Sequence, residues 1–376
     1  MIYHVINANM FHQAPNIIRY TLQFAPQTNK RGVSEHCFLL STGTKVSYLS
    51  NMEETYDVYK EIFSEFNTQN YLFVTTSVAL LYHISKMRKT DKLILHGFSS
   101  LFGKMDFWWA ACLLRGRRFC KSIILMLWSG GTLELKQKGQ AGYILRNMIK
   151  KKAFSDLGYL VALSFDDEKR AKHLYPKANV IVSNTIMDHY NLFNTYKKKH
   201  RRDNKYIKIM VSHSAFAHNN HFETFQLLSP FRHENIKVLC PLSYGNRKYQ
   251  EKIIEKGIEL FGDRFVYFRD LLPLTKYYSL LATLDIFIPG CNIQSGLHVV
   301  LFGLCTGMKM YLRGNNLNYA KGLGFHVNNF AELSKVSFEE LTQPISELTL
   351  SKNDKLARKY FGPEEKIETW KQIYKN

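Results

Sequence analysis

Histidine, serine and asparagine are concentrated in one stretch, residues 208–228, KIMVSHSAFAHNNHFETFQLL. Its apolar start is typical of a strand, and the polar residues follow at the carboxyl end of that strand. Two chemistries fit this pattern: a metal site, or a turn that binds a phosphate. His218 and His221 are three residues apart and could share a helix face, but the HExxH pattern is absent and the spacing offers no third ligand. We therefore expect no metal here, and either a ligand-binding turn or a capping role for His218 and Asn219.

The phosphate hypothesis depends on backbone chemistry. A helix that starts near Asn219 points free N–H groups and the positive end of its dipole at the turn, which suits an anion. Other predicted strands of this half end in similar residues, including an aromatic ring that could stack on a base or sugar and a small turn that opens a helix. The predicted donor-binding residues are Ser212, His213, Ser214, Asn219, Ser243, Tyr244, Gly245, Arg269, Gln294, Ser295 and Gly296.

Alternating strands and helices position these turns. Predicted strands cover residues 2–6, 36–40, 71–76, 92–96, 122–127, 159–163 and 179–183, and then 206–212, 236–242, 265–268, 285–290 and 308–312. Helical patterns lie between most of them, which predicts parallel sheets whose ligands bind at the carboxyl ends of the strands. We predict an α/β fold with two Rossmann-like domains, residues 1–196 and 206–352. A basic linker, 197–205, joins them, and a helix over 353–376 could pack back across their junction onto the N-terminal domain.

The charge of the chain predicts an anionic partner, because 51 lysines and arginines against 31 aspartates and glutamates give a net charge of +20. Cations crowd residues 115–152, directly after the apolar run FWWAACLL at 107–114. This pairing indicates a peripheral membrane surface, and a buried helix followed by a solvated loop is the alternative. No zinc-finger spacing, RNP motif or helix-turn-helix supports nucleic acid. The predicted membrane-surface residues are Phe107, Trp108, Trp109, Arg115, Arg117 and Arg118.

Cysteine usage and hydropathy favour a cytoplasmic protein. The six cysteines lie far apart without a CxxC pair, which is typical of reduced thiols. The start MIYHVINANM lacks the features of a secretory signal, and no run of about 18 uncharged apolar residues predicts a spanning helix.

Three segments together carry a family resemblance: VSHSAFAHNNHFETFQLL, VLCPLSYGNRKYQEKIIEKGIELFG and YYSLLATLDIFIPGCNIQSGLHVVLFGLCTGMKMYL. In order and spacing they are similar to glycosyltransferase family 56, the 4-acetamido-4,6-dideoxygalactose (Fuc4NAc) transferases of enterobacterial common antigen synthesis. LHGFSSLFGKMDFWWAACLL and MLWSGGTLEL extend the resemblance over most of residues 90–315. The chain has Ser-His-Ser at 212–214 where the family pattern is Gly-Asn-Ser, and Trp-Ser-Gly-Gly at 128–131 where it is Trp-Gly-Ala-Asp. These departures leave the sugar open.

The resemblance implies a GT-B fold, in which two Rossmann-like domains face a central cleft. It also implies a nucleotide-sugar donor on the second domain, TDP- or UDP-linked, and an undecaprenyl-diphosphate-linked acceptor at the cytoplasmic face of the bacterial inner membrane. The products would be surface polysaccharides such as the common antigen, O-antigen or capsule. The sequence contains no Asp-x-Asp triplet, and GT-B enzymes neutralise the leaving diphosphate with helix ends and side chains, so no metal or cofactor is expected.

A catalytic base should lie at a strand end of the first domain. His96, after the strand KLIL, is the first candidate, and His12, after the first strand, is the second; a structural role is the alternative for each. The predicted acceptor-binding residues are Trp128, Ser129 and Gly130. Two other functions remain open: a non-catalytic polyanion or nucleic-acid binder, whose binding weakens steeply with salt, and another nucleotide-sugar enzyme such as an epimerase.

Overall fold

The computed structural model of the protein describes residues 1–7, 14–24, 35–41, 52–74, 77–88, 90–97, 105–127, 133, 135, 139, 142–183, 188–197 and 206–375. The chain forms two compact units. The first is Met1–Met187 together with Pro363–Asn376, and the second is Asp188–Gly362. Among the described helices, none has the length and apolar character needed to cross a membrane.

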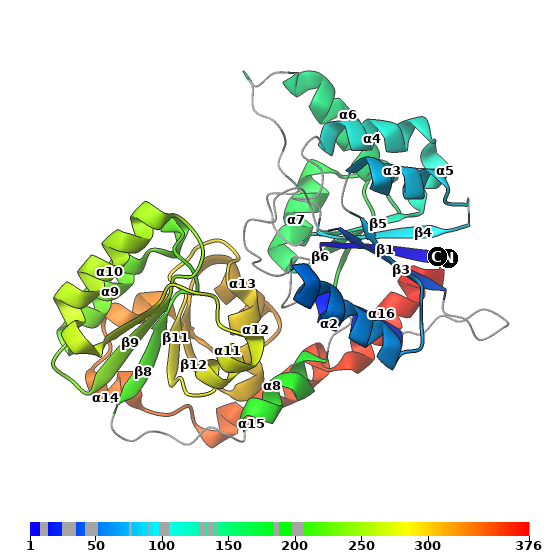
Figure 1. Ribbon diagram of the computed structural model, residues 1–376. Coiled ribbons are helices and arrows are strands. Elements are labelled where there is room, and N and C mark those ends of the chain that lie inside the picture. Colours follow the sequence, from blue (N-terminus) through cyan, green and yellow to red (C-terminus); the bar gives the residue numbers. More distant parts are fainter. Residues whose placement is uncertain are drawn as a thin grey trace. The chain divides into compact units, whose positions relative to one another are not determined.

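The first unit is built on a seven-stranded parallel sheet in the order β3-β2-β1-β4-β5-β6-β7. Its strands are β1 (Ile2–Asn7), β2 (His36–Ser41), β3 (Tyr71–Val74), β4 (Lys92–His96), β5 (Ile123–Leu127), β6 (Tyr159–Ala162) and β7 (Val180–Val182). Its helices are α1 (Ala14–Phe24), α2 (Met52–Glu65), α3 (Ser77–Ser85), α4 (Met105–Leu114), α5 (Arg117–Lys121), α6 (Tyr143–Asp156), α7 (Phe165–Leu174) and α16 (Pro363–Lys375). Helices α4, α5 and α6 lie on one face of the sheet, and α2 and α16 lie on the other (Figure 1).

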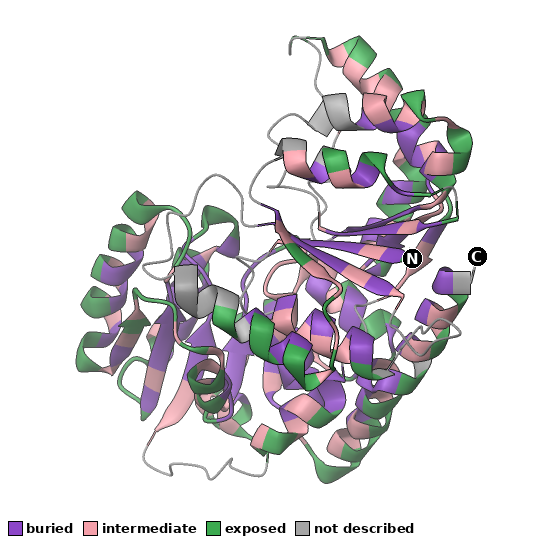
Figure 2. Cartoon of the chain, turned by 45° about the vertical axis from the view of Figure 1, so that its right-hand side comes forward, coloured by how far each residue is buried: buried purple, intermediate pink, exposed green. Residues whose placement is uncertain are grey.

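Alternation along the central strands divides the core of this unit between the two faces of the sheet. Leu93 and Leu95 point toward the face that Trp109 and Phe154 cover, and Ile94 points toward the face of α16. Strands buried on both faces read as continuous apolar runs, which is why these segments were recognisable in the sequence. Figure 2 shows the resulting buried layer along the strands.

The second unit contains a six-stranded parallel sheet in the order β10-β9-β8-β11-β12-β13. Its strands are β8 (Ile207–Val211), β9 (Ile236–Pro241), β10 (Phe265–Phe268), β11 (Ile286–Ile288), β12 (Lys309–Leu312) and β13 (Asn328–Asn329). Its α-helices are α8 (His189–Lys197), α9 (His221–Leu228), α10 (Arg247–Phe261), α11 (Leu274–Leu281), α12 (Leu297–Thr306), α13 (Gly314–Gly322), α14 (Phe338–Thr342) and α15 (Glu347–Phe361). Short 3-10 helices are η2 (Ala217–Asn219), η3 (Ser229–Phe231), η4 (Gly262–Arg264) and η5 (Phe330–Ser334).

The compact units divide the chain at Met187, earlier than the predicted boundary at residue 196. Helix α8 belongs to the second unit because Phe193 is buried there, with its ring 5.5 Å from Tyr278 and 5.2 Å from Phe302. Residues 198–205 of the predicted linker lie outside the described part of the chain.

The C-terminal segment forms two helices where we predicted one over 353–376. Gly362 is extended because a residue that precedes a proline is driven out of the helical region, so α15 ends at Phe361 and α16 begins at Pro363. Helix α16 packs on the first sheet through Trp370, whose side chain is buried. The ammonium group of Lys92, on β4, donates to the carbonyls of Ile373 at 3.0 Å and Tyr374 at 2.6 Å, which satisfies carbonyls in the last turn of the helix.

Candidate functional site

Loops at the carboxyl edge of the second sheet are tied to one another through the backbone. Ala215, after β8, pairs with Gly245, after β9: its amide donates to the carbonyl of Tyr244 at 2.8 Å, and its carbonyl accepts from Asn246 at 2.9 Å. Gly245 has φ +126°, and a Cβ built on it would lie 2.5 Å from the carbonyl carbon of Ala215. The close approach of these two loops therefore requires glycine at position 245.

Three of the predicted donor-binding side chains are buried inside this edge. The hydroxyl of Ser212 lies 2.7 Å from the carbonyl of Pro289 and 3.1 Å from that of Asn219. The amide of Asn219 donates to the carbonyl and the hydroxyl of Ser214, at 2.8 and 2.9 Å. All three side chains are fully buried. They hold the turn in place through hydrogen bonds within the protein, whereas we predicted them as donor-binding side chains.

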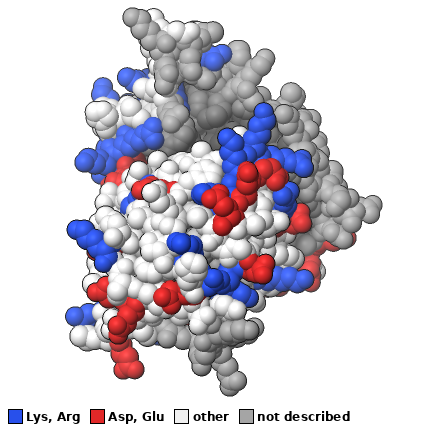
Figure 3. Space-filling view, turned by 90° about the vertical axis from the view of Figure 1, so that its left-hand side faces the viewer, with Lys and Arg blue, Asp and Glu red and all other residues white. Residues whose placement is uncertain are grey.

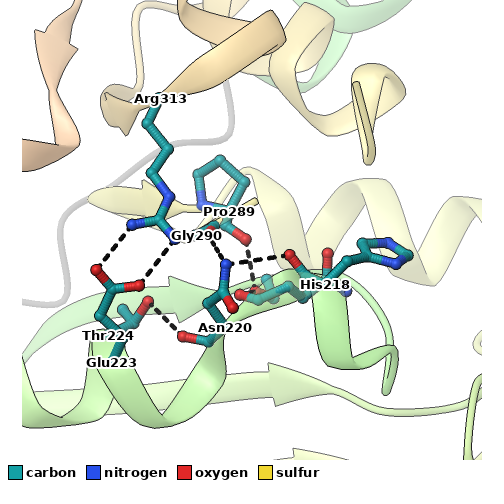
Figure 4. A network of polar contacts seen from close by, with 9 residues as sticks. His218, Asn220, Glu223, Thr224, Pro289, Gly290 and Arg313 are labelled. Carbon is teal, nitrogen blue, oxygen red and sulfur yellow. Dashed lines mark hydrogen bonds and ion pairs between the residues drawn. The ribbon is translucent and has the colours of Figure 1, made fainter. Parts of the chain in front are cut away.

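Asn220 connects this turn to the loop after β11, as Figure 4 shows. Its backbone is left-handed, with φ +49°, and its side-chain amide donates to the carbonyl of Gly290 at 2.9 Å and to that of His218 at 3.3 Å. Gly290 also has a positive φ, and a Cβ there would lie 2.4 Å from the carbonyl oxygen of Asn219. The imidazole of His218 points away from this network.

A serine hydroxyl joins two of the three histidines from the 208–228 stretch. Oγ of Ser295 lies 3.2 Å from Nε2 of His213 and 3.3 Å from Nε2 of His218. Because a hydroxyl donates one hydrogen, it donates to one imidazole and accepts from the other, which fixes opposite tautomeric roles for the two rings. Nδ1 of His213 is buried without a partner among the described atoms. Burial, and then the neighbouring His218, lower the pKa of His213 to about 4.

The three histidines do not converge on a metal. His221 opens α9, whereas His218 lies in η2, so they do not share a helix face. Burial, and then His213 and His218, lower the pKa of His221 to about 3. Within the described residues, no group of three or more histidine, cysteine, aspartate or glutamate side chains could hold a metal ion.

The accessible part of the edge includes aromatic and imidazole rings. Phe216 and Tyr244 are exposed, with ring centroids 6.1 Å apart in an edge-on arrangement, and Phe216 stacks on His218 at 5.4 Å. The ring of Tyr244 lies 6.2 Å from that of His213. We predicted Tyr244 as a stacking residue, and Phe216 is a residue that sequence reasoning missed. Its signal was an apolar side chain inside an otherwise polar turn.

The turn before α12 is the third part of this edge. Gly296 has φ +66°, and a Cβ there would lie 2.6 Å from Nδ1 of His213. The amide of Asn316 donates to the carbonyl of Ser295 at 2.8 Å, and Oε1 of Gln294 is buried without a partner among the described atoms. Helix α12 begins at Leu297, and the amides of Val299 and Val300 donate to the carbonyl of Gly296 at 2.9 and 3.1 Å, so the positive end of the helix dipole lies at this turn. The QSG turn keeps the phosphate-binding role as a prediction.

Two arginines on this side form ion pairs. Arg269, predicted to assist a diphosphate, makes two hydrogen bonds with Glu251 at 3.0 and 2.8 Å, so its charge is shared with a carboxylate of α10. Arg313, which the sequence did not single out, makes two bonds of 2.8 Å with Glu223 (Figure 4). Its guanidinium also lies 4.3 Å from the centroid of the Phe330 ring. Arg313 follows β12, so this pair links α9 to the end of that strand. Ser243, after β9, is half-buried.

A cavity of about 320 Å³ lies at the opposite edge of the same sheet. It is lined at the strand starts by Ile207, Ile286 and Lys309, and deeper by Phe302 and Leu341. Ligands of parallel sheets bind at the carboxyl ends of strands, so this cavity is not the candidate site.

In the first unit, His96 belongs to a buried chain of three imidazoles. Nε2 of His96 lies 3.0 Å from Nδ1 of His4, and Nε2 of His4 lies 2.7 Å from Nδ1 of His36. Burial lowers the pKa of His96 to about 3 and lowers that of His4 well below its usual value. His96 ends β4 as predicted, and its role as a catalytic base stays a prediction. His12, Trp128, Ser129 and Gly130 lie outside the described residues.

The predicted membrane surface is wrong at Trp109. This side chain is fully buried, with its ring 5.0 Å from Phe154, because α4 turns that position toward the sheet. Phe107 and Trp108 lie on α4, and their side chains are outside the described part. Arg115 donates to the carbonyls of Ile84 and Met87, and its guanidinium lies 4.1 Å from the Phe119 ring centroid. The three arginines of the predicted membrane surface, Arg115, Arg117 and Arg118, are exposed, and Arg117 lies 3.4 Å from Asp156.

The comparison with protein families matches residues 1–374 to the family described as 4-alpha-L-fucosyltransferase, glycosyl transferase group 56. No curated protein sequence matches the chain.

Several solved structures share the fold. A glycosyltransferase from Rickettsia africae superposes with a TM-score of 0.63 at 12% identity, covering 100% of this chain and 97% of that one. Anabaena HepE in complex with UDP gives 0.61 at 11% identity, covering 99% and 97%. Sucrose-phosphate synthase from Thermosynechococcus elongatus gives 0.58 at 11%, covering 100% and 98%. Together with the two parallel sheets, these matches confirm the predicted two-unit α/β fold of the GT-B class.

Proposed function

Because the chain belongs to glycosyltransferase family 56, we propose that it transfers a 6-deoxygalactose-type sugar from a nucleotide donor to a lipid-diphosphate-linked glycan. The family description names a fucosyl group, and the resemblance of the sequence points to 4-acetamido-4,6-dideoxygalactose. Both sugars carry a methyl group in place of the C6 hydroxymethyl group, so the shared feature is an apolar C6. The activity as a glycosyltransferase follows from the family, whereas the sugar and the acceptor are part of the proposal.

One observation carries the donor assignment: exposed Phe216, Tyr244 and His218 lie together at the carboxyl edge of the second sheet, beside the QSG turn that opens α12. Aromatic rings provide a stacking surface for a base, and a helix start with adjacent hydroxyl and imidazole groups provides hydrogen-bond donors for a diphosphate. Anabaena HepE, which has a similar fold, was solved with UDP. We propose a pyrimidine nucleoside diphosphate, UDP or TDP, as the leaving group.

Transfer requires that the negative charge that develops on the leaving diphosphate be stabilised. We propose that the positive end of the α12 dipole, the hydroxyl of Ser295 and the imidazole of His218 supply this stabilisation, and that binding requires no metal. His218 is the exposed end of the His213–Ser295–His218 chain, and burial lowers its pKa, so we propose that it acts as a neutral imidazole that donates a hydrogen bond to the diphosphate. The buried serines and asparagines position these groups.

We propose that the acceptor binds the first unit and that the enzyme works at the cytoplasmic face of the bacterial inner membrane. The net charge of +20 supports an anionic partner, which a lipid diphosphate and a membrane surface both supply. A base for the acceptor hydroxyl would then come from the first unit, where His96 and His12 remain the candidates.

Calorimetric titration of the full chain with TDP, UDP and GDP, with and without EDTA, tests the donor site. We expect saturable binding of one nucleotide that EDTA does not change. The double variant His218→Ala, Gln294→Ala should lose about tenfold or more in affinity, because each side chain offers a hydrogen bond at the site. The matched control is His233→Ala, an exposed histidine just before β9, at the amino edge. Absence of nucleotide binding, or a double variant that binds like the unaltered protein, would overturn the proposal.

A further inference from the structure

Helix α6 exposes apolar side chains where a surface helix normally exposes polar ones. Ile144, Leu145 and Met148 are 59%, 64% and 63% exposed. On the same helix, Lys150 is buried, with its ammonium 5.3 Å from the centroid of the Phe154 ring. Three large aliphatic side chains within five positions form an exposed patch on one turn of helix, and such patches mark interaction surfaces.

Cations continue the same face of the helix. Lys151 and Lys152 lie three and four residues beyond Met148, so helical spacing places them on its side of α6. Both are exposed, and Arg118 and Lys121 on the neighbouring α5 are exposed as well. The name α6 face is used below for Ile144, Leu145, Met148, Lys151 and Lys152 of α6 together with Arg118 and Lys121 of α5.

Among the described residues, one buried carboxylate faces two cations at this end of α6. Asp156 is buried, and it contacts two cations, Lys152 at 2.7 Å and Arg117 at 3.4 Å, so one carboxylate is shared between them. On the face drawn in Figure 3, by contrast, lysines and arginines lie among aspartates and glutamates. In the second unit, Lys256 pairs with Glu259 and Arg269 with Glu251.

We propose that the α6 face docks on an anionic lipid surface, with Ile144, Leu145 and Met148 inserted at the headgroup level and the cations of α5 and α6 among the headgroup phosphates. Aliphatic insertion together with a basic rim is the two-signal logic of peripheral binding. This inference deepens the membrane location in the proposed function and replaces the α4 surface predicted from the sequence. The docking surface is thus a helix that follows the predicted one, on the same side of the first sheet.

Charge and side-chain type select this occupant over two others. A second copy of the chain would bring the same cations together, which is unfavourable. Single-stranded nucleic acid is bound through aromatic stacking platforms, and the exposed side chains of this patch are aliphatic. An anionic bilayer accepts both the apolar side chains and the cations.

Sedimentation with vesicles tests the proposal without donor or acceptor, so its outcome is independent of sugar transfer. Full-length protein is mixed with phosphatidylcholine vesicles that contain or lack phosphatidylglycerol. We expect binding only to the anionic vesicles, and we expect Leu145→Ser, Met148→Ser to lower the partition coefficient by about tenfold or more. The matched control is Ile258→Ser, Leu348→Ser, two exposed aliphatic positions on α10 and α15 of the second unit, which should bind like the unaltered protein.

A charge variant separates the two parts of the face. Each cation near an anionic surface contributes about fivefold, so Arg118→Gln, Lys151→Gln should weaken binding at low salt by roughly 25-fold and should have less effect at high salt. Nucleotide titration of every variant should match the unaltered protein, which distinguishes a failed docking surface from a failed donor site. Equal sedimentation of the Leu145→Ser, Met148→Ser protein, or a dimer that this variant abolishes, would overturn the proposal.

Discussion

Acidification should destabilise the first unit through its buried histidine chain. His96 and His4 are buried and hydrogen-bonded, and burial is the largest cause that lowers the pKa of each, to about 3 for His96. In the unfolded chain a histidine titrates near its usual pKa of about 6.5. Between these two values the unfolded state binds a proton and the folded state does not. The free energy of unfolding is therefore unaffected above about pH 6.5 and falls as the pH decreases toward the folded pKa.

The magnitude follows from that difference in proton binding. At pH 5, protonation stabilises an unfolded histidine with a pKa of about 6.5 by about 2 kcal/mol. The buried imidazole of His96 stays neutral at this pH, so the free energy of unfolding falls by that amount. His4 adds a contribution of the same sign. Burial raises the pKa of Asp167, and that carboxyl acts in the opposite sense, so a single pH profile mixes the two effects. A difference between two proteins isolates His96.

The substitution His96→Gln keeps an amide near the position of Nε2, which bonds His4, and removes the titration. We expect the free energy of unfolding, measured with urea, to fall between pH 7.5 and pH 5 in both proteins. The fall should be about 2 kcal/mol smaller in this variant than in the unaltered protein. The four tryptophans, at 108, 109, 128 and 370, all belong to the first unit, so their fluorescence follows that unit alone. His173→Gln, on the exposed surface of α7, is the matched control. Identical pH dependence in His96→Gln and the unaltered protein would refute a neutral, buried imidazole at this position.

Three further predictions concern packing and ion pairs. Gly296→Ala should destabilise the second unit by more than about 1 kcal/mol in thermal unfolding and abolish nucleotide binding, because its Cβ would lie 2.6 Å from a buried imidazole nitrogen. The control is Gly262→Ala, at φ +54° with open space around it, which should show only the backbone cost of about 1 kcal/mol. Glu223→Ala should lower the free energy of unfolding of this unit by about 1 to 2 kcal/mol, since it leaves the largely buried Arg313 without its carboxylate. Equal stability of the variant and the unaltered protein at low and at high salt would contradict this. Trp370→Ala should cost the first unit about 3 to 5 kcal/mol in urea unfolding, because the side chain fills the core between α16 and the sheet, and an unchanged midpoint would show that α16 contributes nothing.

The sequence was sufficient for β1 to β12, whose central strands are apolar runs buried on both faces, and it missed β13, a strand of two asparagines without an apolar pattern. The predicted strand at 92–96 coincides with β4, and that at 236–242 extends one residue past β9. Helix orientation was harder to predict. The run at 107–114 is apolar all round, so its periodicity could not show that Trp109 points at the core, and the exposed aliphatics of α6 lie in a segment that reads as basic. The break before Pro363 had a local signal, Gly-Pro, whereas the length of the surrounding helical pattern favoured a single helix.

At the carboxyl edge of the second sheet, the sequence was sufficient to locate the loops. It was less successful in assigning roles to their side chains. Ser212 has a left-handed backbone, φ +59°, which is costly for a residue with a side chain, and its buried hydroxyl hydrogen-bonds across to the loop after β11. Small polar residues that hold such turns and small polar residues that bind phosphate have the same composition, so pattern alone cannot separate them. Exposure separates them here: Ser212 and Asn219 fix the loops against one another, and Phe216, His218 and Tyr244 face outward. A rigid, strained turn that presents a few exposed groups is the arrangement that preorganised stabilisation of a leaving diphosphate requires.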